Sequence, residues 1–233
     1  MIGPRQAGAT LVRYTRRTRR FHAGVYLLTS LLLATGWWLL LGREGQPSPL
    51  ALLVRLPDVE LHKWTGWALT ALGVAVPTVA WGAVGRFLRE SVRFRSDDRR
   101  WLAHWPVAVF TGRFHRHEGH FDPGQRLANL LIAGLMVVVV GSGIVLVAVH
   151  GGPVFVWATR LHRWATYLLT PLLAGHVLVA SGVLPGYRGA WRSMHGRGIV
   201  PEDTARRLWP GWTERQERLT SPSPPHRQQE HPG

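Results

Sequence analysis

The sequence predicts an all-α membrane protein, built as a bundle of four transmembrane helices with both termini in the cytoplasm. Two observations carry this prediction: four apolar stretches of membrane length, and arginines that gather in alternate connecting segments. About 20 apolar residues in a helix are enough to cross a hydrocarbon core roughly 30 Å thick. Four such stretches in 233 residues leave too little polar chain to surround them with soluble structure. We therefore expect a multi-pass protein of the bacterial inner membrane.

The apolar stretches define the expected helices. Acidic and basic residues other than His are absent from 21–42, 64–85, 127–159 and 164–187. We expect transmembrane helices at about 21–41, 62–85, 127–149 and 161–184. The segment Thr18-Arg19-Arg20-Phe21 resembles an export signal, but its apolar run is long, lacks a small-x-small cleavage site and precedes three more spans. The first helix is therefore expected to remain in the protein.

The distribution of positive charge predicts the orientation. The chain has 28 basic and 13 acidic residues, and its formal net charge is +15. Arginines are concentrated before the first helix, in the loop 86–125 and after the last helix, whereas the other two loops have few. Basic loops stay on the cytoplasmic side, so these three segments are predicted inside, against anionic lipid. Nucleic-acid binding would need a basic face on a soluble domain, and the sequence shows no such face.

Four segments follow from these boundaries. Residues 1–20 form a basic cytoplasmic N-terminus, and 21–184 form the membrane domain. Residues 185–212 are expected to be a cytoplasmic docking segment. Residues 213–233, rich in Ser, Pro, Gln, Glu and His, are predicted to be a disordered tail.

Four of the twelve histidines lie in or at the ends of the expected helices: His22, His62, His162 and His176. Ionisable residues inside membrane helices are costly and usually face the bundle interior with a partner. Neutral imidazole is a common ligand of haem iron, and two imidazoles fill both axial positions. His162 and His176 project from one helix face, about 21 Å apart along the axis.

Depth predicts how these histidines pair. The first helix runs outward, so His22 lies near the inner face. The second and fourth helices run inward, so His62 and His162 lie near the outer face, and His176 remains for His22. This arrangement predicts two bis-histidine sites stacked across the bilayer. If the last helix ends near residue 184, His176 lies about 12 Å from its inner end, so a tilt or a shift of the spans must bring His22 level with it.

The histidines and the glycines near them also allow other interpretations. The histidines could instead be interfacial residues of a haem-free scaffold. Gly24, Gly66 and Gly175 lie near them in sequence and would make room for a flat macrocycle. Residues 115–120 contain three further histidines but no Cys, and we interpret them as an exposed polar segment rather than a metal site. The remaining histidines are read as loop or tail residues: His104, His150, His195, His226 and His231.

Several stretches resemble the gamma subunit of respiratory formate dehydrogenases, a four-helix di-haem b-type cytochrome related to the cytochrome b subunits of nickel-iron hydrogenases. The matching stretches are Arg20-Phe21-His22, Thr35-Gly36, Leu61-His62-Lys63-Trp64-Thr65-Gly66, Phe121-Asp122-Pro123-Gly124-Gln125-Arg126, the pair His162 and His176, Trp191-x-x-Met194-x-x-x-Gly198-x-Val200, and Pro210-Gly211-Trp212. Together they cover about residues 13–212.

The resemblance implies two b-type haems, held without covalent attachment because the chain has no Cys. His62 and His162 would hold the outer haem, and His22 and His176 the inner one. Electrons would arrive from an iron–sulfur beta subunit bound to a catalytic alpha subunit. They would leave to menaquinone or ubiquinone near the inner haem. The complex as a whole could form a higher oligomer.

The resemblance also implies a quinone pocket made by His176, Asp122, Gly124 and Gln125. Two positions depart from the family pattern. Asp122 stands where the family usually has Asn, which bears on the quinone hydrogen bond. Leu208 and Trp209 stand where the family usually has a His pair, which bears on docking.

Other partners fit much of the same pattern. A nickel-iron hydrogenase cytochrome b and a stand-alone di-haem quinol-oxidising cytochrome are the alternatives to a formate dehydrogenase subunit. The chain has no cysteines for iron–sulfur clusters and no molybdenum or tungsten site. We therefore expect electron transfer and quinone reduction, but no formate oxidation, from this chain itself.

Overall fold

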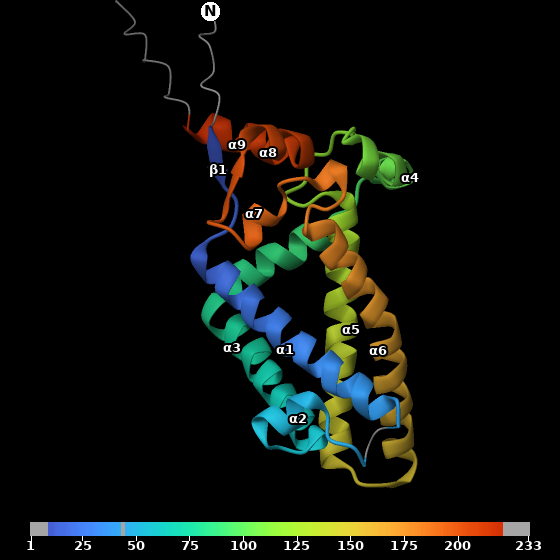
Figure 1. The fold of residues 1–233 in the computed structure, drawn as a ribbon. Coiled ribbons are helices and arrows are strands. Elements are labelled where there is room, and N and C mark those ends of the chain that lie inside the picture. Colours follow the sequence, from blue (N-terminus) through green and yellow to red (C-terminus); the bar gives the residue numbers. More distant parts are fainter. Residues whose placement is uncertain (1–8, 43–44, 221–233) are drawn as a thin grey trace, which may run out of the picture.

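The computed structural model describes residues 9–42 and 45–220, which are mostly helical (Figure 1). In chain order the elements are β1 Thr10–Val12, α1 Arg16–Leu40, α2 Pro49–Val54, α3 Asp58–Val92, α4 Ser96–Thr111, α5 Pro123–Ala148, α6 Gly152–Ala180, the 3₁₀ turn η1 Pro185–Tyr187, α7 Trp191–Met194, β2 Ile199–Pro201, α8 Glu202–Leu208 and α9 Pro210–Thr220. The first and last described elements lie at the same end of the molecule.

The long helices α1, α3, α5 and α6 form the bundle. α1 packs against α3, α3 against α5, and α5 against α6. Three of them, α1, α3 and α5, are long and apolar enough to cross a membrane. There are up to four candidate spans if α6 and the segment Pro185–Met194, which is bent from it by 61°, count as one span. The described residues thus contain three to four candidate spans, and the side on which the termini lie stays a prediction.

Lipid-facing surface is evident on these helices. Val137 on α5 is 72% exposed and Val79 on α3 is 84% exposed, although both are apolar. They belong to a much larger set of exposed apolar side chains on the long helices, and a bilayer offers such a surface an apolar solvent. The exposed apolar surface supports the assignment of the bundle to a membrane.

The helices begin or end outside the predicted spans because local signals extend them. α1 begins at Arg16, since the Thr15 hydroxyl accepts the Thr18 N–H at 3.2 Å and caps the helix. α3 continues to Val92 and bends at Ala80, whose φ of −135° is not helical, three residues after Pro77.

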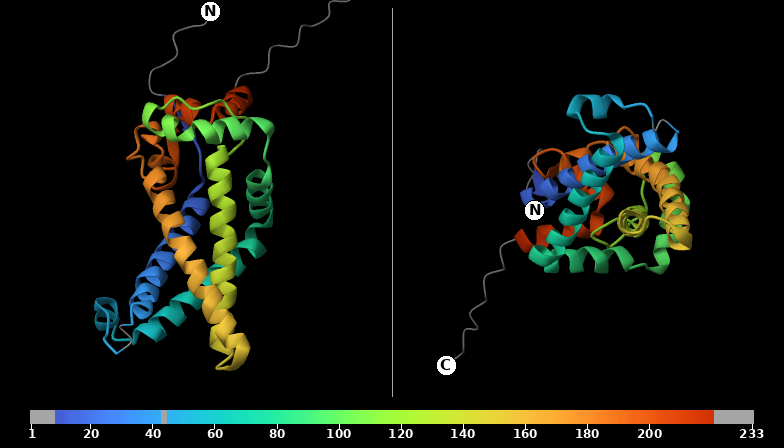
Figure 2. Two further views of the ribbon diagram at one scale, coloured as in Figure 1. Left: turned by 90° about the vertical axis from the view of Figure 1, so that its right-hand side faces the viewer. Right: turned by 90° about the horizontal axis from the view of Figure 1, so that it is seen from below.

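The predicted loop 86–125 is mainly helical, which corrects the expectation of a simple connection. The end of α3 covers its first part, and α4 lies across the end of the bundle (Figure 2). α4 begins where Asp98 Oδ2 accepts the Arg95 N–H at 2.7 Å. It is anchored by Trp101, which is 3% exposed, and by Trp105 Nε1, which donates to the Tyr187 hydroxyl at 3.0 Å.

We call the region formed by β1, α4 and residues 185–220 the cap. β1 and β2 pair as antiparallel strands, with Leu11 opposite Val200. Beneath them lies the cap core, made by Val109, Tyr187, Ala190, Val200, Ala205, Leu208, Trp209 and Trp212. Leu208 and Trp209, at the positions that depart from the family pattern, are therefore buried against their own chain.

A buried arginine joins the N-terminal segment to this core. Arg13 is 6% exposed, and its guanidinium lies 4.4 Å from the ring centres of both Trp209 and Trp212. It also donates to the His120 carbonyl oxygen. Burial lowers the pKa of Arg13, because the charged form loses hydration. The two aromatic faces and the hydrogen bond partly offset that loss.

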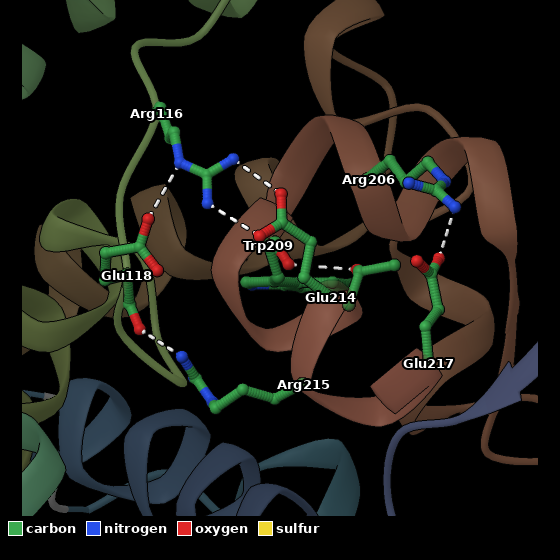
Figure 3. Close-up of polar contacts among 8 residues, drawn as sticks. Arg116, Glu118, Arg206, Trp209, Glu214, Arg215 and Glu217 are labelled. Atoms are coloured by element: carbon green, nitrogen blue, oxygen red, sulfur yellow. Dashed lines mark hydrogen bonds and ion pairs between the residues drawn. The ribbon is translucent and has the colours of Figure 1, made fainter. Parts of the chain in front are cut away.

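α9 continues to Thr220, eight residues into the segment predicted as a disordered tail, while 221–233 lie outside the described residues. Burial of Trp212 and Thr213 holds the first turn of α9, and ion pairs at the surface add to it (Figure 3). Arg116 binds both carboxylate oxygens of Glu214 at 2.6 and 2.8 Å and also contacts Glu118 at 2.7 Å. Arg215 donates to the Glu118 carbonyl at 2.9 Å. α9 is thereby fastened to the segment that precedes α5.

Candidate functional site

The structure brings together the two histidine pairs that depth predicts. The rings of His62 on α3 and His162 on α6 lie 6.2 Å apart between centres, and we call them the outer pair. The rings of His22 on α1 and His176 on α6 lie 6.4 Å apart, nearer the cap, and we call them the inner pair. Two imidazoles on opposite sides of one iron, with bonds of about 2 Å, separate their ring centres by roughly 6 Å. Both pairs therefore fit bis-histidine binding of haem iron, and haem ligation by these residues stays a prediction.

A shift of the spans brings the inner pair level. α6 ends at Ala180 rather than near 184, so His176 lies close to its inner end. α1 begins at Arg16 rather than 21, so His22 lies inside the helix instead of opening it. α6 also begins at Gly152, which places His162 inside that helix and not at its start.

The outer pair is fixed by hydrogen bonds at Nδ1. His62 Nδ1 lies 2.9 Å from the Thr35 hydroxyl of α1. His162 Nδ1 lies 3.1 Å from the Ser142 hydroxyl and 3.0 Å from the Val139 carbonyl oxygen, both on α5. Each histidine therefore meets a hydroxyl from the facing helix, and His162 also meets a backbone carbonyl.

Glycines beside the outer pair differ from the three that sequence proximity suggested. A Cβ on Gly36 would lie 3.1 Å from His62 Cε1, and one on Gly143 would lie 3.4 Å from His162 Cε1. By contrast, a Cβ on Gly24 would meet Leu72 rather than a histidine. A Cβ on Gly66 would lie 3.9 Å from Leu32, and one on Gly175 would have no protein atom within 4 Å. Gly36 and Gly143 lie on the helices that face the histidines, which sequence adjacency cannot reveal.

The inner pair has different surroundings. His22 Nδ1 is buried, and it has no hydrogen-bond partner among the described residues. The ring of His195, expected to be a loop residue, lies 5.7 Å from His22 and 5.9 Å from Tyr26 between centres. The bend after α6 returns α7 to the start of α1 and carries His195 with it (Figure 1). His195 was not among the predicted site residues, and its position next to Met194, in a stretch that resembles the family, is the one signal in the sequence that points to it.

Three of the four residues predicted for a quinone pocket, Asp122, Gly124 and Gln125, lie where α5 begins, at the cap end, whereas His176 lies on α6. The Asp122 carboxylate accepts the Gln125 N–H at 2.8 Å and caps α5, while Gln125 Nε2 lies 3.4 Å from the Tyr14 hydroxyl. Burial raises the pKa of Asp122, and the Gln125 hydrogen bond and neighbouring positive groups oppose this rise. A Cβ on Gly124 would approach Trp101 to 3.0 Å, so close packing accounts for this glycine. Their role toward quinone stays a prediction.

The histidine-rich segment 115–120 is only partly the exposed polar segment predicted. His117 is 6% exposed, and its Nε2 lies 2.8 Å from the Leu208 carbonyl oxygen. Burial lowers the pKa of His117. Burial and the positive charge of Arg13 lower the pKa of His120 to about 3. Both histidines are therefore neutral near pH 7, and they hold the cap against the bundle.

His115 is exposed, and its ring lies 4.8 Å from that of His104. Within residues 9–42 and 45–220, no group of three or more His, Cys, Asp or Glu side chains could hold a metal ion.

Comparison with known proteins gives one family. A family model described as prokaryotic cytochrome b561 matches residues 13–197, a range that contains both histidine pairs. No curated protein matches the chain.

Proposed function

The chain belongs to the prokaryotic cytochrome b561 family, whose members are membrane proteins that bind b-type haem and transfer electrons, and from this premise we propose that it is the cytochrome b subunit of a respiratory formate dehydrogenase. It would take electrons from an iron–sulfur subunit outside the inner membrane and deliver them to quinone at the inner side. The observation that carries the proposal is the presence of two histidine pairs at different depths of one bundle.

Each pair has a distinct task in this proposal. Bound haem supplies reversible one-electron chemistry. His62 and His162 hold the outer group near the electron-donating subunit, and His22 and His176 hold the inner one. The two ligands on α6 are about 21 Å apart along the helix, so the pairs divide the membrane into two shorter electron transfers.

The quinone step is proposed for the cap end. His176 lies near the inner end of α6, and Asp122 and Gln125 lie at the start of α5, so all three belong to the same end of the bundle. Quinone reduction takes up protons as well as electrons. A buried carboxyl with a raised pKa is suited to holding a proton at this end.

Purification of the full chain with its partners tests the assignment. A molybdenum- or tungsten-containing subunit together with an iron–sulfur subunit is expected to co-purify and to give formate-dependent quinone reduction. A nickel-iron hydrogenase in its place, or an active chain without partners, would overturn the formate dehydrogenase assignment.

Haem content tests the two-pair arrangement independently of the partner. Acid–acetone should extract all haem, at two haems per chain. In isolated membranes, H62A and H162A should remove the same haem from the difference spectrum, whereas H22A should remove the other. The pairing would be refuted if H22A and H162A removed the same haem.

A further inference from the structure

One short sequence pattern occurs twice in the bundle, facing the two histidines of the outer pair. On α1 the residues are Leu32-x-x-Thr35-Gly36, and on α5 they are Val139-x-x-Ser142-Gly143. In each copy a hydroxyl residue is followed directly by a glycine, and both residues lie against the ring of an outer histidine. The repeated arrangement indicates a shared task toward the histidines.

The first copy orients His62. The Thr35 hydroxyl has one proton, and the Leu31 carbonyl oxygen, 2.9 Å away, accepts it. The hydroxyl oxygen is then an acceptor toward His62 Nδ1, at 2.9 Å. Thr35 is fully buried, so neither group can replace this bond with bulk water. His62 is therefore favoured as the tautomer with its proton on Nδ1.

The second copy leads to the same tautomer by a stricter argument. The Val139 carbonyl oxygen, 3.0 Å from His162 Nδ1, has only lone pairs, so the ring nitrogen must carry the proton. The Ser142 hydroxyl donates to the Val138 carbonyl at 2.6 Å and accepts from the same ring nitrogen at 3.1 Å. Ser142 is 5% exposed, which protects the arrangement from solvent.

The inner pair lacks this support on at least one side. His22 Nδ1 is buried without a hydrogen-bond partner among the described residues. The two pairs thus differ in how their imidazoles are held, although their ring separations are nearly equal.

We propose that Thr35 and Ser142 are positioning residues which fix the outer histidines with Nε2 free for the iron, and that they give the outer haem a lower reduction potential than the inner haem. A ligating imidazole that donates its other N–H is more basic and gives more electron density to the metal. Greater donation stabilises the ferric state, and this lowers the potential. Electron transfer from the outer to the inner haem is then downhill.

The inference rests on His62 and His162 holding one haem, and it does not depend on which dehydrogenase donates the electrons. H62A identifies the outer haem as the component that disappears from a potentiometric measurement. If both haems survive H62A and H162A, the ligand assignment itself is refuted, an outcome distinct from failure of the hydrogen-bond argument.

The test uses T35V and S142A, singly and together, in the full-length haem-loaded protein. We expect the potential of the outer haem to rise in each single variant and to rise further in the double variant. The inner haem should keep its potential, and T35S, which retains the hydroxyl, should restore the native value. Loss of a hydrogen-bond partner of a metal ligand also weakens metal binding by about 10-fold or more, so haem retention should fall in parallel.

T70V is the matched control, since Thr70 makes the same bond to its own helix, to the Gly66 carbonyl oxygen at 2.8 Å, within α3. T70V should leave both potentials unchanged. The inference is overturned if the double variant keeps two haems with unshifted potentials, if the shift falls on the inner haem, or if T70V produces the same shift. It is likewise overturned if the outer haem has the higher potential in the native protein.

Discussion

Replacement of Gly36 by Ala should loosen the outer haem, because the added methyl group meets the His62 ring. The built Cβ lies 3.1 Å from His62 Cε1 and 3.7 Å from Nδ1, so the ring must move by a few tenths of an ångström. The Thr35 hydrogen bond at 2.9 Å resists that movement. Overpacking of this kind costs about 1–3 kcal/mol. Each 1.4 kcal/mol is a factor of ten, so haem should bind about 5- to 150-fold more weakly.

Haem transfer to excess apomyoglobin, followed by absorbance in detergent solution, measures this loss. The chain offers a graded series of controls. At Gly143 the Cβ would lie 3.4 Å from His162 Cε1, at the limit of ordinary contact, so G143A should have a smaller effect. At Gly134, also on α5, nothing lies within 4 Å, so G134A should match the native protein.

The reasoning fails if G36A retains two haems and releases them at the native rate. It fails equally if G134A is as damaging as G36A, since the effect would then come from altered helix propensity rather than from contact with the ligand.

Three further predictions concern the cap. R13A removes the guanidinium held between two tryptophans and should destabilise the cap by about 2 kcal/mol, measured by denaturation monitored through tryptophan fluorescence. D98N leaves the buried charge of Arg126, which lies 2.7 Å from Asp98 in the native protein, uncompensated at a cost of about 3–5 kcal/mol, whereas R116A, at an exposed pair, should cost far less by the same measurement. The pKa of His120 is about 3 in the folded cap, so below about pH 6.5 the unfolded chain binds a proton that the folded chain does not. Cap stability should therefore fall as the pH falls from 6.5 toward 3, which limited proteolysis can follow. H120N should weaken this dependence on pH.

The spans and the histidine pairs could be predicted because they depend on one-dimensional properties. Hydropathy locates each helix, alternating charge gives its direction, and depth then leaves one partner for His22. These steps use no knowledge of side-chain contacts, and the pairs found together are the pairs expected.

The surroundings of the histidines could not be predicted in the same way. Thr35 and Ser142 are ordinary small polar residues of membrane helices until the facing helix supplies an imidazole. His195 reaches the inner pair only because the chain bends after α6, and no periodicity in the sequence records that bend. Likewise, α9 is helical where composition indicated disorder, because Trp212 and Thr213 are buried in the cap and Glu214 pairs with Arg116, which lies far earlier in the sequence.

The pairing of β1 with β2 gives the protein an order of assembly. Thr10 leaves the ribosome early, but its partner Pro201 follows only after every spanning helix has been made. His162, the second residue of the outer pair, is synthesised before β2, so the outer pair can form while β1 still has no partner strand. The cap and His195 take their places beside the inner pair last. Formation of the cap is therefore expected to be the final, C-terminal step of folding.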